Sequence, residues 1–448
     1  MITKKGKSKM ITLMKNKGTR RKIFIIISFL IFVRVGSLIP IPGVNADYME
    51  ALVSGSEFQF LNMIMGNSLS HMSLFALSIG PYITASIIIQ LMTLLIPKLE
   101  ELNKEGKTGQ EIIQKVTNYT GIGIGFVQAL FMAIGLGKKG LLDTYNWQTI
   151  LFMTCVWTLG SAVLILLSEK ISKFEMGNGV SYILLLNILS SFPFDVFRVQ
   201  ERLVNRENAF ASVLFMIIAG VVFLLFIAVA VFLNLSEKRI PIKFSRKSIS
   251  GGNNDHLPVP LNVCNVMPII FTGSIFSMIS ILAAFSKSTI LVTITRYLTQ
   301  SNWFDIKNPI YTIGTILYVI LVFFFANFYL DIAFNSDEIA YRLKQQGATV
   351  PGIRPGNPTS EYLRKNAKEM KTIGTVIVLI LVLGSTLLCN VLNIGVLSIG
   401  GTSILIVVNV IIESSKKLKT VAQSVKSTSY YSRNKKGSLF RSKGVKNV

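Results

Sequence analysis

Long apolar runs recur along the whole chain, and they constrain its fold more than any other feature. Ten of them approach or reach the roughly 20 apolar residues that a helix needs to cross a bilayer: 23–40, 74–96, 117–137, 148–168, 178–192, 209–235, 263–285, 308–332, 372–390 and 394–413. Only 15% of the 448 residues are charged, whereas a soluble protein has charges on about a quarter. The chain is therefore predicted to be an all-α polytopic membrane protein.

The distribution of lysine and arginine predicts the orientation. With the N-terminus in the cytosol, the cytosolic segments hold 37 of the 46 basic residues, the external segments hold 8, and Arg34 lies within the first run. Basic residues accumulate in cytoplasmic loops, so both termini are predicted to be cytoplasmic. The basic head (1–22) and tail (414–448) could also attract anionic lipid or RNA. The first run lacks a small-residue cleavage site and is interpreted as an uncleaved span.

Several functional classes find no support in the residues. Cys155, Cys264 and Cys389 fall in separate apolar runs, and His71 and His256 are far apart, so neither a disulfide nor a metal site is expected. No phosphate-binding glycine loop or nucleophile motif is evident, and neither a cofactor nor enzymatic activity is predicted. A small-solute transporter remains an alternative, although such proteins usually need acidic groups in the membrane, and no Asp or Glu lies near the middle of a run.

Polar residues and prolines interrupt the apolar runs at a few positions. Asn187, Asn262, Asn265 and Asn327 are candidates for interhelical hydrogen bonds, and Arg34 is within snorkelling reach of an interface. Pro81 and Pro268 are expected inside spans, where proline kinks a helix. Residues four apart near them, Ile79 with Ile83 and Ile270 with Ser274, share a helix face. Such a face can line a pore, but it more often faces lipid or the core.

Two segments outside the spans have unusual compositions. The external segment 45–73 has no lysine or arginine, and its apolar part "FQFLNMIMG" is too short to cross a bilayer. It is either re-entrant or an interfacial helix. The polar loop "VPGIRPGNPTSEYL" has Arg354 between Pro351, Pro355 and Pro358. The prolines restrict the loop, which lowers the entropy lost on binding, and arginine suits phosphate or carboxylate partners.

Seven segments in this order resemble the SecY family, the channel subunit of the bacterial Sec translocon: "RVGSLIPIPGVN", "GPYITASIIIQL", "KEGKTGQEIIQKVTNY", "GNGVSYI", "HLPVPLNV", "VPGIRPGNPTSEYL" and "GGTSILIVV". The resemblance extends from about Arg21 to Val408. The resemblance implies ten transmembrane helices in two pseudo-symmetric five-helix halves, 23–192 and 209–413, which open like a clamshell. It also implies an external hinge loop at 193–208 and a short re-entrant plug helix near 58–70.

The resemblance also implies roles for individual residues. The pore ring corresponds to Ile79, Ile83, Leu184, Ile270, Ser274 and Ile406, and the plug to Phe58, Phe60, Leu61, Met63, Ile64 and Met65. An apolar collar of this kind resists water and ions by dewetting yet can widen around a chain. Spans two and seven correspond to the lateral gate through which signal sequences reach lipid. Pro81 and Pro268 are then hypothesised to aid gating.

The implied function is the passage of unfolded, signal-bearing polypeptides across the bacterial plasma membrane and the release of transmembrane segments into lipid. The cytosolic loops 236–262 and 333–371 would dock the SecA ATPase or the ribosome through Arg354, Lys238, Arg239, Lys243, Arg246 and Lys247. SecE and SecG are the implied partner subunits, secretory and membrane-protein precursors are the substrates, and no DNA partner is expected.

Three departures from the family pattern stand out. Asn265 occupies a position where the family has glycine, Asn118 replaces the arginine of Thr-Arg-Tyr, and "SEKI" (Ser168–Ile171) replaces Gly-Glu-Gln-Ile. These changes raise the alternative of an accessory SecY that serves a few export substrates. Both large cytosolic loops nevertheless keep the family motifs and length, which accessory copies tend to lose.

Overall fold

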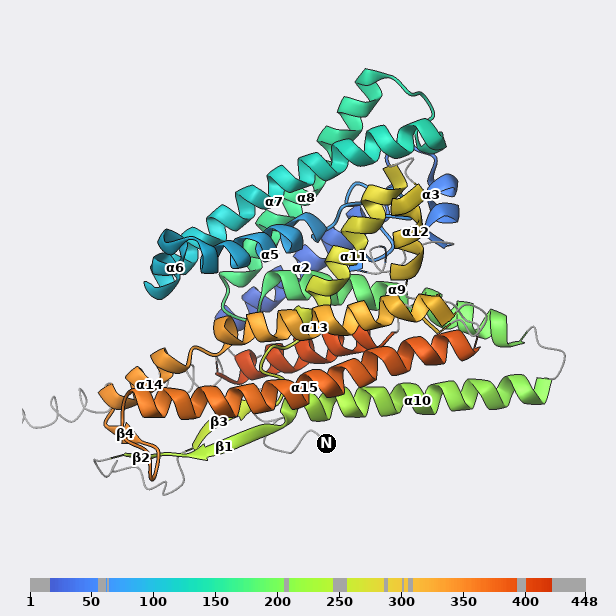
Figure 1. Cartoon of the computed structure of the whole chain (residues 1–448). Coiled ribbons are helices and arrows are strands. Elements are labelled where there is room, and N and C mark those ends of the chain that lie inside the picture. Colours follow the sequence, from blue (N-terminus) through green and yellow to red (C-terminus); the bar gives the residue numbers. More distant parts are fainter. Residues whose placement is uncertain are drawn as a thin grey trace, which may run out of the picture.

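The computed structural model describes residues 17–54, 62, 64–204, 209–244, 256–285, 289–299, 302–304, 309–392 and 400–420. A helix overlaps each of the ten apolar runs (Figure 1). In the first half the long helices are α2 (Lys17–Gly36), α5 (Gly80–Leu95), α7 (Lys107–Leu136), α8 (Trp147–Ser172) and α9 (Gly179–Val204). The shorter elements there are α3 (Ala46–Ser54), α6 (Pro97–Lys104) and the π-helical turn η1 (Gly137–Leu141).

The second half has the same number of long helices in its described residues. They are α10 (Ala209–Leu235), α11 (Met267–Phe285), α13 (Thr312–Ala333), α15 (Asn357–Leu392) and a last helix over 401–420. Shorter elements are α12 (Thr289–Leu298), the 3-10 turn η3 (Pro309–Tyr311) and α14 (Ser336–Gln345). The Asn335 side chain caps α14 by accepting a 3.1 Å hydrogen bond from the Glu338 amide, which satisfies one free donor of the first turn.

Two small sheets, which the all-α prediction did not include, form from the segments that connect α10 to α11 and α14 to α15. Strand β1 (Glu237–Pro241) pairs antiparallel with β3 (His256–Pro260). Strand β2 (Lys243–Phe244) pairs antiparallel with β4 (Ala348–Thr349), which comes from the other large loop. The β2–β4 pairing therefore joins the two segments that were expected to be separate docking loops. In Figure 1, β1–β4, α14 and α6 all lie at the left end of the molecule.

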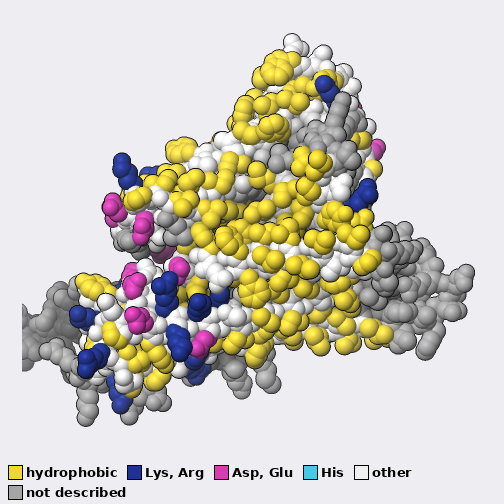
Figure 2. Space-filling model, viewed as in Figure 1, with side chains coloured by type: hydrophobic (Ala, Val, Ile, Leu, Met, Phe, Trp, Pro, Cys, Tyr) yellow, Lys and Arg dark blue, Asp and Glu magenta, His cyan; other side chains and the backbone are white. Residues whose placement is uncertain are grey.

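The outer surface is suited to lipid. Among the described residues, four helical stretches are long and apolar enough to span a membrane, and the bent pair α5–α6 would make a fifth. Figure 2 shows apolar side chains over the middle of the molecule, with charged side chains gathered at the left end. Leu224, Phe232, Ile316, Ile320 and Phe324 are each more than half exposed. Such a surface is unstable in water but matches a bilayer.

One hydrophobic cluster runs through both halves. It contains Val33 of α2, Leu164 of α8, Leu233 of α10, Phe325 of α13 and Leu381 of α15. A second cluster, around Trp157, packs α8 against α7 and the segment before α5. A third cluster, around Val259 and Leu363, holds the sheets against α14 and α15. The first of these clusters therefore packs the two halves against each other in this conformation.

Several boundaries differ from the predicted ones. The second span was expected from residue 74, but 74–79 form successive turns and α5 begins at Gly80. Pro81 and Pro268 consequently lie in the first turns of α5 and α11, where the missing proline N–H has no helical acceptor to lose. The segment 193–208, expected to be a loop, is helical as far as Val204, because α9 continues through Pro193.

Candidate functional site

Five of the six predicted pore-ring residues are buried in the cluster that runs through both halves. Ile79 precedes α5, Ile83 lies on α5, Leu184 on α9, Ile270 on α11 and Ile406 on the last helix. Their exposed fractions range from 0% to 8%. Ser274 lies one turn after Ile270 on α11 and is half-buried. Residues from four helices and from both halves therefore contribute to one apolar core.

The predicted plug falls only partly within the described structure. Phe58, Phe60, Leu61 and Met63 lie outside the described residues. Ile64 and Met65 are both buried, at 4% and 5% exposure. Ile64 belongs to the same cluster as the five pore-ring residues, whereas Met65 belongs to the cluster around Trp157. The chain therefore passes from the first hydrophobic cluster to the second between Ile64 and Met65.

The backbone from Gly66 to Ser78 is held by turns and side-chain hydrogen bonds. Asn67, Met72 and Ser78 adopt positive φ values of 64°, 45° and 47°, a region in which residues other than glycine are uncommon. The Asn62 carbonyl accepts from the Asn67 amide at 2.9 Å, and its side-chain oxygen accepts from the Ser70 amide at 3.0 Å. This segment is therefore compact without being a regular helix.

Two polar residues from other helices contact this segment. Arg34 of α2 donates from Nη1 to the Gly66 carbonyl at 3.1 Å. Asn187 of α9 donates from Nδ2 to the Ile64 carbonyl at 2.9 Å. The sequence identified both residues as polar interruptions of apolar runs but did not predict these contacts. Arg34 had been expected to reach toward an interface, and it instead holds a backbone carbonyl inside the molecule.

The two helices of the predicted lateral gate are in contact. Helix α11 packs against both α5 and α7, so the two halves touch along this side. Pro268 is buried at the start of α11, where its carbonyl accepts a 2.8 Å hydrogen bond from Thr272 Oγ1. Asn265, just before α11, has a φ of 53°. Asparagine tolerates this left-handed conformation better than most residues.

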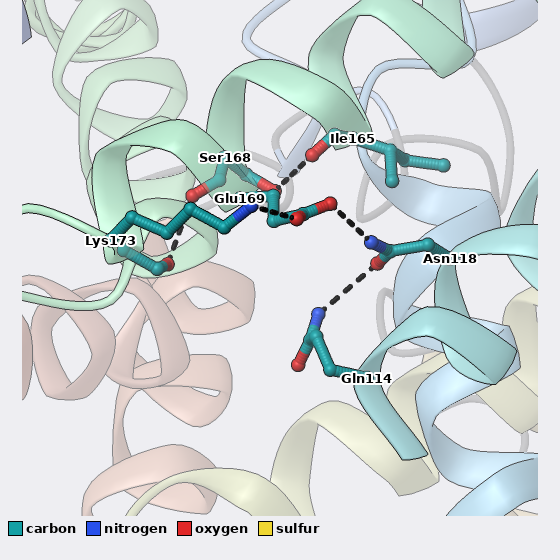
Figure 3. Close-up of polar contacts among 7 residues, drawn as sticks. Gln114, Asn118, Ile165, Ser168, Glu169 and Lys173 are labelled. Atoms are coloured by element: carbon teal, nitrogen blue, oxygen red, sulfur yellow. Dashed lines mark hydrogen bonds and ion pairs between the residues drawn. The ribbon is translucent and has the colours of Figure 1, made fainter. Parts of the chain in front are cut away.

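A chain of polar side chains links three helices of the first half, and Figure 3 shows its members from α7 and α8. Gln114 donates from Nε2 to Tyr82 Oη at 2.9 Å and to Asn118 Oδ1 at 3.1 Å. Asn118 donates to Glu169 Oε2 at 2.8 Å, and Lys173 pairs with Glu169 Oε1 at 2.6 Å. The hydrogen bond to Glu169 and the charge of that residue raise the pKa of Lys173. The chain connects α5, α7 and α8.

The predicted docking residues lie at the charged end of the molecule. Lys238 and Arg239 are exposed on β1, Lys243 is exposed on β2, and Arg354 is exposed in the loop after β4. Arg246 and Lys247 lie outside the described residues. Lys238 pairs with Glu369 at 3.4 Å and Arg239 with Glu237 at 3.1 Å, whereas no ion pair of Lys243 or Arg354 occurs within the described ranges.

The loop that carries Arg354 has a defined conformation. Gly352 and Gly356, on either side of Arg354, have φ values of 81° and 104°, which only glycine adopts readily. Thr359 Oγ1 donates to the Arg354 carbonyl at 2.8 Å, and the Ile353 amide donates to the Val350 carbonyl at 3.1 Å. The β2–β4 pairing brings Lys243 directly opposite Thr349, five residues before Arg354. Basic residues of the two loops are thereby placed on one platform.

Comparisons with known proteins agree on one family. The SecY family model matches residues 73–415. The protein translocase subunit SecY of Rickettsia typhi is 34% identical over 422 residues, covering 90% of this chain and 94% of the relative. A solved structure of a protein-conducting channel superposes with a TM-score of 0.62 at 18% identity, covering 89% of this chain and 90% of that chain. Canine Sec61, solved in a ribosome-channel complex, gives a TM-score of 0.59 at 18% identity over 89% of this chain and 90% of that one. The family model matches well over half of the chain, and the Rickettsia typhi relative is 34% identical over most of both chains. This chain therefore belongs to the SecY family.

Proposed function

We propose that the chain is the protein-conducting channel of a Sec translocon. In this role it passes unfolded, signal-bearing polypeptides across the bacterial plasma membrane and releases transmembrane segments into lipid. The observation that carries the proposal is the burial of Ile79, Ile83, Leu184, Ile270 and Ile406 in one apolar cluster built by helices of both halves. Membership of the SecY family supports the same function.

The proposed mechanism uses the shared interior of the two halves. While the halves touch, the apolar collar excludes water and ions by dewetting. Separation of the halves would open the collar and free a path for an extended chain. The same separation would part α11 from α5, which are in contact here, and give a signal sequence access to lipid. An apolar collar makes no sequence-specific contacts, which suits a channel for many substrates.

Partner proteins would supply the energy for translocation and stabilise the channel. The platform formed by β1–β4 and the Arg354 loop is proposed to dock the SecA ATPase or the ribosome, since exposed Lys243 and Arg354 leave their charges available to an anionic partner. SecE and SecG are proposed as companion subunits that brace the two halves. Both termini are proposed to be cytoplasmic, in keeping with the excess of basic residues in those segments.

Protease protection of a precursor tests this function. The chain is reconstituted with SecE and the SecA of its host in vesicles, and a signal-bearing precursor and ATP are added. We expect ATP-dependent protection with the wild type, a steep loss with Arg354→Glu, and normal insertion and abundance of that variant. Lys98→Glu is the matched control, because it reverses an exposed charge on α6, outside the proposed platform.

The outcomes separate the alternatives. Protection of general precursors that survives Arg354→Glu would remove the docking role but leave the channel. Protection of only a dedicated precursor, with an accessory SecA, would identify an accessory SecY. Absence of protection for any precursor would overturn the channel and return the small-solute transporter to consideration.

A further inference from the structure

The described stretch Ile64–Gly66 is held from two sides by side chains that reach its backbone. Asn187 Nδ2 lies 2.9 Å from the Ile64 carbonyl oxygen, and Arg34 Nη1 lies 3.1 Å from that of Gly66. Arg34 belongs to α2 and Asn187 to α9, so two helices far apart in sequence converge on three residues. Both contacts are made to backbone carbonyls, which fixes the position of the chain independently of its side chains.

Asn187 makes a further contact on the other side of its amide. The same Nδ2 atom donates to Ser78 Oγ at 3.0 Å, so both protons of the NH2 group have acceptors. Ser78 directly precedes Ile79, a predicted pore-ring residue, and Asn187 lies three residues after Leu184, another one. Asn187 is 2% exposed. A buried amide at this place ties Ile64 to the entrance of α5 and to the wall of the proposed pore.

The backbone fits closely against this asparagine. A Cβ atom on Gly66 would lie 2.9 Å from Asn187 Cα and 3.0 Å from Asn187 Cβ, and Gly66 itself has a φ of 68°. Asn67, Met72 and Ser78 nearby also have positive φ. Residues in such sparsely populated conformations persist only when their surroundings hold them. The segment is therefore strained, and loss of its holding contacts favours a different conformation.

We propose that Asn187 is a positioning residue that latches the segment 64–78 in the closed channel. This inference rests on the proposed function, because it concerns the resting state of that channel. A polypeptide that passes the pore ring must displace Ile64, which shares the ring's cluster. Displacement of Ile64 breaks the hydrogen bond from Asn187 to the Ile64 carbonyl, and water in the opened pore can then satisfy the amide. The latch thus biases the channel toward closure without locking it.

Resting ion conductance tests the latch. The complex is purified from host membranes and placed in planar bilayers without precursor. Asn187→Leu removes both bonds while keeping a side chain of similar size, and each lost hydrogen bond shifts an equilibrium roughly three- to tenfold. We expect resting conductance to rise by about tenfold or more, and Ser78→Ala, which removes one bond, to give an intermediate rise. Precursor translocation by both variants should persist.

Asn234→Leu is the matched control. Asn234 is also a buried asparagine, but its partners are Asn262 and the Ala230 carbonyl in the second half, away from the segment. We expect its resting conductance to equal that of the wild type. If Asn187→Leu and Asn234→Leu conduct alike while wild type and variants translocate precursor, the latch is wrong and the channel stands. If the wild type translocates nothing, the proposed function itself has failed.

A disulfide crosslink provides a second, independent test, which remains possible if Asn187→Leu does not fold. Gly66→Cys and Asn187→Cys are combined in a chain whose native Cys155, Cys264 and Cys389 are replaced by serine. The expected Cβ separation is 3.0 Å, and a Cβ on Gly66 would also lie 2.9 Å from Asn187 Cα. The two backbones must therefore move apart by several tenths of an ångström to reach the roughly 3.8 Å of a disulfide. Oxidation should stop translocation and reduction should restore it. Undiminished translocation through the crosslinked protein would overturn the proposal.

Discussion

The Asn118 amide donates a 2.8 Å hydrogen bond to Glu169 Oε2 and thereby joins α7 to α8. The carboxylate of Glu169 also has a cationic partner. Here the cation comes from Lys173, one turn after Glu169, at 2.6 Å from the other carboxylate oxygen. Asn118 is buried, whereas the Lys173 side chain is 71% exposed. The cation that pairs with Glu169 therefore lies at the surface, and a neutral hydrogen-bond donor lies inside.

Asn118→Leu is expected to destabilise the packing of α7 on α8. The substitution leaves Glu169 Oε2 without its buried donor, and the free energy of unfolding should fall by roughly 1–2 kcal/mol. Asn118→Arg should retain wild-type stability, because it can pair with Glu169 directly. Unfolding in mixed micelles with increasing denaturant measures both variants.

Lys173→Ala is the control for this pair. Its ion pair with Glu169 is largely exposed and screened by solvent, so its loss should leave the free energy of unfolding almost unchanged. Equal stability of Asn118→Leu and the wild type would mean that the Asn118–Glu169 bond contributes nothing to the packing of the two helices.

Gly160→Ala is expected to force α8 away from the segment that precedes α5. A Cβ atom on Gly160 would lie 2.2 Å from the Leu74 carbonyl oxygen, which is backbone and cannot rotate away. Overpacking of this kind destabilises by about 1–3 kcal/mol. A Cβ atom on Gly123 of α7 would have nothing within 4 Å, so Gly123→Ala should be neutral. Membrane abundance and the unfolding midpoint compare the two, and similar values would refute the close approach.

The sequence predicted the position of every long helix because the bilayer leaves few alternatives. A chain in lipid must satisfy its backbone internally, so an apolar run near 20 residues long becomes a helix. The exact ends were less predictable. Residues 74–79 are as apolar as the helix that follows, yet Ser78 adopts a positive φ and α5 starts only at Gly80. Local composition does not encode that contact-dependent conformation.

The contacts around the candidate site could not be predicted from the sequence. Asn187 and Ile64 are 123 residues apart, and their hydrogen bond depends on how α9 packs. The available signal was a polar residue in an apolar run, which predicts some hydrogen bond but not its partner. The β2–β4 pairing likewise joins two loops through two-residue strands that carry no recognisable strand pattern.

Thr359→Val is expected to weaken partner docking without affecting membrane insertion. Thr359 Oγ1 closes the loop by donating 2.8 Å to the Arg354 carbonyl, and valine keeps the shape but removes the donor. The lost hydrogen bond raises the free-energy cost of ordering the loop on binding by about 1 kcal/mol, which corresponds to roughly fivefold weaker binding of SecA or the ribosome. Sedimentation with proteoliposomes measures this affinity. Thr372→Val is the control, because the Thr372 hydroxyl donates to the Lys368 carbonyl of its own helix, outside the loop. An equal effect of both variants would show that the loop closure is irrelevant.

Ile270→Asn is expected to make the resting channel leak. Ile270 is 5% exposed on α11 within the cluster shared by both halves. An amide at this point binds water, and a hydrated collar loses the dewetting barrier that excludes ions. Resting conductance in planar bilayers should therefore rise several-fold while precursor translocation continues. Ile316→Asn is the matched control, since Ile316 is 56% exposed on α13, where a polar side chain meets lipid rather than the collar. A folded, translocating Ile270→Asn channel that stays as tight as this control would remove Ile270 from the pore ring.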